Sequence, residues 1–195
     1  HDLRTPLTRM KLQLEMMPEN EDTQAMKADI IHMQKMIDGY LDFARGDEGE
    51  AITKTHLYEI ADRIKQRFSA NNTQIHWFIP EYIQLSLRPL SFERCLVNLI
   101  SNACKYSENV WVKASISDDE RVEIVVEDDG PGISEDLYED VFKPFYRVDG
   151  ARSEGTGGTG LGLSIAMDVV HNHGGRIWLD RSDQGGLKVS MRMPL

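Results

Sequence analysis

Two glycine-rich stretches in the second half of the chain have the composition of nucleotide-binding turns. The longer one is Gly155-Thr156-Gly157-Gly158-Thr159-Gly160-Leu161-Gly162-Leu163, and it runs directly into a segment with helical apolar spacing. Glycines let the backbone approach an anion closely, and the N–H groups at a helix start favour phosphate. The pattern matches neither the P-loop GxxxxGK[ST] nor the strand-GxGxxG-helix form. The stretch alone indicates a phosphate-binding turn, with a flexible surface loop as the alternative.

The shorter glycine motif, Asp128-Asp129-Gly130-Pro131-Gly132, follows a strand-like run. A carboxylate at a strand end beside a tight turn can accept a hydrogen bond from an exocyclic amine such as that of adenine. The alternative is an ordinary acidic turn.

A third element places Asn98, Asn102 and Lys105 at positions i, i+4 and i+7, on one face of an otherwise apolar helix. Polar groups in such surroundings need a partner. Amide oxygens suit Mg²⁺ and an ammonium suits phosphate, so this face predicts a site for a metal-nucleotide. A helix cap or a solvated stripe would explain one of the three residues but hardly all of them.

The chain opens with a possible nucleophile in the run His1-Asp2-Leu3-Arg4-Thr5-Pro6-Leu7-Thr8. In a heptad frame, His1 and Thr5 fall outside the apolar seam and point outward. An exposed imidazole can act as a nucleophile when a neighbouring carboxylate, here Asp2, orients it or takes its proton. A chance terminal histidine or a tag remnant is the alternative.

The first 45 residues have the periodicity of two helices. Apolar side chains are spaced alternately four and three residues apart on both sides of a polar loop at 18–22, at Leu3, Leu7, Met10, Leu14 and Met17, and then at Met26, Ile30, Met33, Ile37, Tyr40 and Ala44. Each helix has one apolar seam, so a single hairpin cannot close a core. Residues 1–45 are therefore predicted to dimerise into a four-helix bundle.

A glycine-rich acidic stretch at 46–53 predicts an exposed linker, and a second domain follows at 54–195. The pattern indicates a mixed α/β fold with roughly five strands and a long loop at 129–159. We expect helices near 57–68, 91–106 and 161–173, and strands near 74–79, 83–87, 110–117, 121–127, 176–181 and 187–193.

The amino-acid composition limits the binding partners and the cellular compartment that we expect for the chain. The 195 residues include 32 acids and 22 bases, and a net charge of −10 argues against nucleic acid. The two cysteines lack metal or disulfide spacing, which favours a reducing compartment. No apolar run approaches the ~18 residues of a membrane span, and no signal peptide precedes the first motif, so we expect the chain as given to be soluble.

Taken in order, these elements resemble the boxes of the sensor histidine kinases over essentially the whole chain. His1 to Thr8 resembles the H box, and Asn98 to Tyr106 resembles the N box. The two glycine motifs resemble the G1 and G2 boxes, with an F box, Phe142-Lys143-Pro144-Phe145-Tyr146-Arg147, between them. The H box, the Tyr146-Arg147-Val148-Asp149 stretch and the compact Gly-Thr-Gly-Leu-Gly-Leu are most similar to the osmosensing EnvZ subgroup.

This resemblance implies an all-α dimerisation and phosphotransfer hairpin followed by an α/β sandwich of the Bergerat (GHKL) type that binds ATP. It implies that His1 is phosphorylated, that Asn102 holds Mg²⁺ and that Asp128 binds the adenine amine. Further expected ATP contacts are Asn98, Lys105, Tyr106, Gly130, Gly132, Phe145, Arg147, Gly158, Thr159, Gly160, Leu161 and Gly162. Asp129 stands where relatives often have Asn, which is expected to add negative charge near the nucleotide and to weaken ATP binding modestly.

The resemblance also implies a response-regulator receiver domain as the acceptor of the phosphoryl group, and a phosphatase activity in which Thr5 holds a water. The chain would be the cytoplasmic part of a bacterial inner-membrane receptor whose membrane spans are absent from this chain. Two other classes share some features: an ATPase of the topoisomerase or mismatch-repair type, and a non-enzymatic dimerisation module. The H box and the acidic charge oppose the first, and the intact nucleotide motifs oppose the second.

Overall fold

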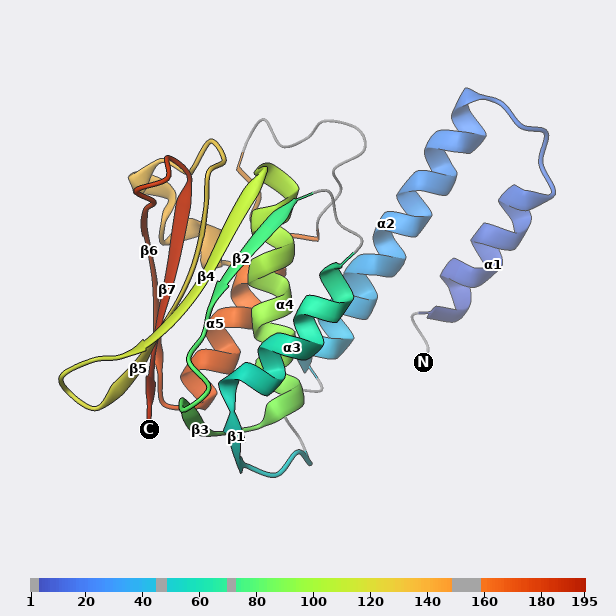
Figure 1. Cartoon of the computed structure of the whole chain (residues 1–195). Coiled ribbons are helices and arrows are strands. Elements are labelled where there is room, and N and C mark those ends of the chain that lie inside the picture. The colour runs from blue at the N-terminus through green and yellow to red at the C-terminus, as the bar shows by residue number, and fades with distance from the viewer. Residues whose placement is uncertain (1–3, 45–48, 70–72, 149–158) are drawn as a thin grey trace.

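A helical hairpin precedes a mixed α/β unit in the computed structural model (Figure 1). The structure describes residues 4–44, 49–69, 73–148 and 159–195. Helix α1 spans Arg4–Glu15 and helix α2 spans Glu21–Ala44. Within the described ranges, no helix combines the length and the apolar character that a membrane span requires.

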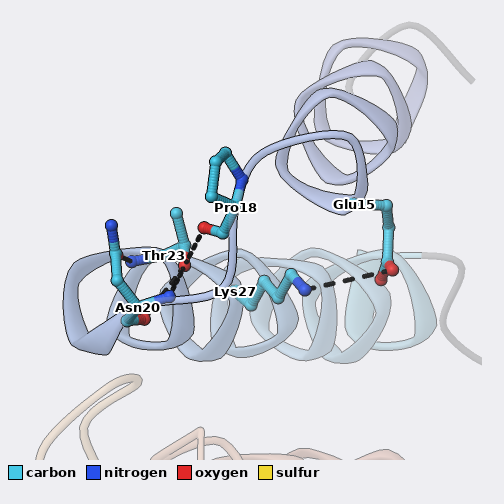
Figure 2. A network of polar contacts seen from close by, with 5 residues as sticks. All are labelled: Glu15, Pro18, Asn20, Thr23 and Lys27. Carbon is cyan, nitrogen blue, oxygen red and sulfur yellow. Dashed lines mark hydrogen bonds and ion pairs between the residues drawn. The ribbon is translucent and has the colours of Figure 1, made fainter.

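The turn between α1 and α2 is fixed by side chains that cap the second helix (Figure 2). The N–H of Thr23 donates to Asn20 Oδ1 at 2.8 Å, and the N–H of Asn20 donates to Thr23 Oγ1 at 2.8 Å. This reciprocal pairing satisfies N–H groups that the first helical turn cannot. A long contact of 3.9 Å between Lys27 and Glu15 joins the two helices beyond the turn. The cap explains why the chain reverses directly after Pro18.

Only part of the predicted apolar seam is buried within one hairpin. Leu7 and Leu14 on α1 and Ile30 on α2 are buried, whereas Met10 on α1 and Met17, just beyond its end, are about half exposed, at 48% and 51%. Two helices can cover one side of each seam and leave the other side in solvent. The hairpin is confirmed, and it leaves several large apolar side chains exposed: Met10, Leu12, Met16, Met17, Met26, Ile31 and Met33.

The second unit is a five-stranded sheet in the order β2-β4-β5-β7-β6, with a separate two-stranded sheet of β1 and β3. Strand β2 runs parallel to β4, and the other neighbours in the larger sheet are antiparallel. Figure 1 shows helices α3, α4 and α5 together on one face of this sheet. The strands are β1 (Thr53–His56), β2 (Gln74–Phe78), β3 (Gln84–Leu87), β4 (Asn109–Ile116), β5 (Arg121–Asp128), β6 (Arg176–Arg181) and β7 (Leu187–Pro194). The helices are α3 (Leu57–Phe68), α4 (Pro89–Tyr106) and α5 (Gly162–Asn172).

The core lies between the sheet and these helices. Alternate residues of β5, Val122, Ile124 and Val126, are almost fully buried, as a sheet with one covered face requires. Opposite them, α4 contributes a continuous buried stripe that includes Phe92, Leu96 and Ile100. The α/β sandwich predicted from the sequence is confirmed.

Two segments carry more local structure than the sequence predicted. The polar sequence Thr53–His56 forms strand β1, paired with β3, although we expected residue 53 to end an exposed linker. Within the loop expected over 129–159, Glu135–Leu137 and Asp140–Phe142 form two 3₁₀ turns, and Val141 in the second turn is buried. In both places, contacts with distant segments outweigh weak local propensity.

Candidate functional site

A cavity of about 500 Å³ lies where the C-terminal end of α4, the N-terminal end of α5 and the end of β5 meet. Its size suits a small-molecule ligand. Sequence reasoning singled out ten of its lining residues: Asn98, Asn102, Lys105, Tyr106, Asp128, Gly132, Arg147, Thr159, Gly160 and Gly162. It did not single out five lining residues that lie within the quoted motifs: Ser101, Pro131, Tyr146, Val148 and Leu163. It also missed Ile133, Val141 and Leu187, which are apolar and lie outside the motifs.

Asp128, the last residue of β5, is held by backbone donors on two sides. Its Oδ1 accepts from the N–H of Gly130 at 2.9 Å and from the N–H of Leu187 at 3.2 Å. Burial raises the pKa of the Asp128 carboxyl, and these two hydrogen bonds oppose the rise. Because both bonds are to Oδ1, Oδ2 keeps its capacity to accept a hydrogen bond from a ligand amine in the cavity.

Gly186, in the turn between β6 and β7, supports Asp128 and was missed by sequence reasoning. Its N–H donates to the backbone oxygen of Asp128 at 3.1 Å. A Cβ added at Gly186 would lie 2.1 Å from Asp128 Oδ1 and 2.6 Å from the nitrogen of Gly130. Only glycine allows the two turns to approach this closely. The Gly185-Gly186 pair was visible as a hairpin turn, but nothing local linked it to a carboxylate so far back in the sequence.

The predicted polar face of α4 reaches the cavity. Asn98, Asn102 and Lys105 all line it, and the Lys105 ammonium lies 5.0 Å from the centre of the Tyr106 ring. The Nδ2 of Asn98 is buried and has no hydrogen-bond partner within the described part of the chain. A buried amide without a partner is costly, and a ligand that supplies an acceptor would remove that cost.

These donors fit Mg²⁺ bound together with a phosphate ligand. Amide oxygens are hard ligands, and Mg²⁺ in proteins is commonly held by one or two side chains plus substrate phosphates and water. Asn102 and Asn98 offer such oxygens beside the Lys105 ammonium, which suits phosphate.

The F-box segment and the second glycine motif are joined at one point of the cavity wall. The N–H of Phe145 donates to the backbone oxygen of Gly160 at 3.0 Å, and both residues have positive φ angles, 65° and 71°. A Cβ on Gly160 would lie 2.8 Å from the carbonyl carbon of Phe145. Glycine is thus required at position 160 by both its backbone conformation and this close approach.

Three of the predicted contacts lie outside the lining. The Phe145 side chain is half exposed, Leu161 is buried in the core directly before α5, and Gly130 donates its N–H to Asp128 behind the cavity wall. Their observed positions fit a role in shaping the wall.

Asp129 is placed differently from our expectation. Its carboxylate accepts hydrogen bonds from the backbone N–H groups of Glu108 and Asn109, each at 3.0 Å, and from Asn109 Nδ2 at 2.7 Å. Although burial alone would raise the pKa of Asp129, these bonds lower it. Asp129 does not line the cavity, so its charge serves to fasten β4 to the turn after β5.

The predicted phosphoacceptor residues His1 and Asp2, and Gly158 of the second glycine motif, lie outside the described residues. Thr5 is exposed on α1, as its position off the seam predicts. Helix α2 passes close to the edge of the cavity at Gly39. A Cβ added to Gly39 would lie 3.0 Å from Leu161 Cδ1 and 3.9 Å from Thr159 Oγ1. The hairpin and the cavity wall are therefore in contact in this structure.

Two family models match the chain, and between them they cover most of it. Residues 88–195 match "Histidine kinase-, DNA gyrase B-, and HSP90-like ATPase", a range that contains the whole cavity lining. Residues 1–49 match "His Kinase A (phospho-acceptor) domain".

Curated relatives align along the full chain. RstB, a sensor protein of Escherichia coli K12, is 33% identical over 208 residues, which cover 100% of this chain and 47% of RstB. The sensor histidine kinase GtrS of Pseudomonas aeruginosa is 33% identical over 196 residues, covering 100% of this chain and 40% of GtrS. The sensor histidine kinase CpxA of E. coli K12 is 31% identical, covering 100% and 45%. The chain thus spans less than half the length of these relatives.

Solved structures share the fold. Full-length ShkA in complex with AMPPNP superposes with a TM-score of 0.68 at 24% identity, covering 100% of this chain and 44% of ShkA. The Acinetobacter baumannii histidine kinase AdeS superposes with a TM-score of 0.67 at 19% identity, covering 100% of this chain and 97% of AdeS.

Proposed function

Since the chain belongs to the sensor histidine kinase family, we propose that its cavity binds Mg·ATP and that the γ-phosphoryl group passes to His1. The observation that carries this proposal is the convergence of Asp128, with one carboxylate oxygen available, and Asn98, with its buried amide nitrogen lacking a partner, on one cavity. A ligand with an amine at one end and phosphates at the other would satisfy both groups.

In this proposal, Asp128 Oδ2 accepts a hydrogen bond from the adenine amine while apolar lining residues such as Ile133 and Leu187 flank the base. Cationic side chains, Lys105 and Arg147, neutralise the phosphates. The N–H groups at the start of α5, near Gly160 and Gly162, add the partial positive charge of a helix N-terminus, and Thr159 and Gly158 precede them in the chain.

Asn102, with Asn98 beside it, would hold Mg²⁺ through an amide oxygen. The bound cation would neutralise charge that develops between the β- and γ-phosphates during transfer. Asn102 itself orients the metal-nucleotide, and Lys105 one turn later on the same helix face holds the phosphate chain.

In the transfer step, an imidazole nitrogen of His1 forms a bond to the γ-phosphorus. The bond between that phosphorus and the bridging oxygen breaks, and ADP leaves with the electron pair. The other imidazole nitrogen releases its proton to Asp2, the adjacent base in the sequence. The product is phosphohistidine, which can then pass its phosphoryl group to an aspartate of a response-regulator receiver domain.

The helical hairpin supplies the dimer in this account. Its exposed seam residues, Met10, Met17, Met26 and Met33, form the second side of each seam, and a partner hairpin would bury them as a four-helix bundle. We place the phosphotransfer hairpin at 1–45, the linker at 46–53 and the ATP-binding domain at 54–195. The intact protein would carry this part on the cytoplasmic side of a bacterial inner membrane.

The proposal is tested by incubating the full chain with γ-labelled ATP and then treating it with acid or base. Phosphohistidine loses the label in acid and keeps it in base. Asn102→Ala should lower the labelling rate by at least ~100-fold, the usual effect of removing a charge-stabilising element. Asn172→Ala, on the exposed end of α5, is the matched control and should label normally. An acid-stable label, or no label on the wild-type chain, would contradict the proposal and favour a related ATPase or a non-enzymatic module.

A further inference from the structure

Glu50, in the segment expected to be an exposed linker, makes three hydrogen bonds to the start of α4. Its Oε1 accepts from the N–H of Leu90 at 2.7 Å and its Oε2 accepts from the N–H of Ser91 at 3.0 Å. Its backbone oxygen accepts from Arg88 Nε at 3.1 Å. These contacts show that the segment around Glu50 packs against the nucleotide-binding unit and is not only a spacer between the two units.

The contacts complete a helix end that lacks a cap of its own. The N-cap residue Arg88 makes no side-chain cap, and Pro89 has no N–H to satisfy. The next two donors, Leu90 and Ser91, go to the Glu50 carboxylate, and Phe92 donates to the backbone oxygen of Arg88 at 2.9 Å. Every donor of the first turn is therefore accounted for, and the negative charge lies at the positive end of the helix.

The same end of α4 is tied to the end of α5. The N–H of Arg88 donates to His173 Nε2 at 2.9 Å, which leaves Nδ1 of that ring to donate to the backbone oxygen of Val169 at 2.7 Å. Helix α4 is 18 residues long, or roughly 27 Å, and its opposite end carries Asn102 and Lys105. Glu50 thus attaches the linker to the two helices that frame the cavity, at the ends remote from it.

We propose that Glu50 is a positioning residue that fixes the point at which the helical hairpin is attached to the nucleotide-binding unit. This inference rests on the proposed function and deepens it. With Glu50 in place, five residues of sequence, 45–49, form the tether between the end of α2 at Ala44 and the attachment point. Without this contact, the tether extends over residues 45–52, up to the start of β1 at Thr53.

The longer tether lowers the effective concentration of the nucleotide cavity near the phosphoacceptor helix. Effective concentration falls roughly as the −3/2 power of tether length, so the rate of transfer to His1 should fall roughly twofold or more. Nucleotide affinity should not change, because α4 is held in the core by buried residues such as Phe92 and Leu96, independently of Glu50. A kcat effect without a Kd effect is the signature of this role.

The test uses the full chain with a donor and an acceptor dye at Asp29 on α2 and Asp118 in the β4–β5 turn, both on the surface. Dilution with unlabelled protein makes each dye pair report on one chain. In Glu50→Ala, the distance distribution should widen, kcat at saturating Mg·ATP should fall roughly twofold or more, and the Kd for a non-hydrolysable analogue should stay within ~1.5-fold. Glu50→Gln, which keeps only one acceptor oxygen, should show the same effects in weaker form.

Glu59→Gln, an exposed position on α3, is the matched control and should leave all three measurements unchanged. An unchanged distance distribution, or a Kd that weakens in step with kcat, would overturn the positioning role and leave Glu50 as a structural cap. Loss of analogue binding by the wild-type chain would instead refute the proposed function, so the two failures are distinguishable.

Discussion

Gly186→Ala should damage nucleotide binding from a residue that does not line the cavity. The added methyl group would lie 2.1 Å from Asp128 Oδ1 and 2.4 Å from the backbone oxygen of Asp128, whereas real Cβ contacts are essentially never under 3.0 Å. Neither neighbour is a flexible side-chain end, because Oδ1 is held by the N–H groups of Gly130 and Leu187. The turn and the carboxylate must therefore separate by roughly 1 Å.

That displacement should break the hydrogen bond between the adenine amine and Asp128. A hydrogen bond to a charged group contributes about 1.5–3 kcal/mol, which corresponds to a roughly 10- to 150-fold increase in the Kd of an ATP analogue. The forced separation should also lower the free energy of unfolding by about 1–3 kcal/mol. Calorimetric titration gives the Kd and thermal unfolding checks that the variant is folded.

Gly185→Ala is the control for strain within the turn. Gly185 has a φ of +107° and nothing within 4 Å of an added Cβ, so the substitution strains the backbone without contacting Asp128. It should lower the melting temperature and leave the Kd within about twofold. A folded Gly186→Ala protein with wild-type affinity would show that Asp128 does not depend on this turn, and the reasoning would be refuted.

Two further predictions concern Asp128 and Thr5. Burial raises the pKa of Asp128, so as the pH is lowered this carboxylate should protonate, and analogue affinity should fall, at a higher pH than it would for an exposed Asp. Over the same pH range, the contribution of Asp128 to the free energy of unfolding should rise as the pH falls, because the folded state binds the proton more tightly than the unfolded state. Asp128→Asn should remove both pH dependences. Thr5→Ala should slow dephosphorylation of the response regulator by roughly 10- to 100-fold, because the water that Thr5 holds would be lost, and it should leave autophosphorylation nearly unchanged. A parallel fall of both measured rates would reject the water-positioning role of Thr5.

The parts of the site that follow from the sequence are those whose signal is local. Asn98, Asn102 and Lys105 recur at helical spacing among apolar residues, so their common face could be predicted without knowing what it meets. Asp128 could be placed because it ends an alternating strand run and precedes two glycines. These signals depend on periods of two and 3.6 residues, which persist in the folded chain.

The parts that could not be predicted depend on contacts between distant segments. The polar run Thr53–His56 becomes a strand only because β3 lies beside it, and Glu50 looks like part of a solvated acidic stretch until the start of α4 supplies two unsatisfied N–H groups. Asp129 was expected to repel the nucleotide, since its proximity to Asp128 in the sequence gave no sign that its carboxylate bonds to Asn109.

The extent of burial in the helical hairpin also could not be predicted from the sequence. The spacing predicts which residues form the seam, but it does not say which of them one chain can bury alone. Leu7 and Leu14 are covered within the hairpin while Met10 and Met17 are half exposed, a division that depends on the crossing of two particular helices.

The central claim, that one domain binds ATP and the other accepts its phosphoryl group, is tested most directly by His1→Gln in the full chain. Phosphorylation and binding of a non-hydrolysable Mg·ATP analogue are measured on the same sample. Loss of all acid-labile phosphate with a Kd equal to that of the wild type is the predicted result. Persistent acid-labile phosphate, or a loss of affinity together with phosphorylation, would contradict the separation of the acceptor from the nucleotide cavity.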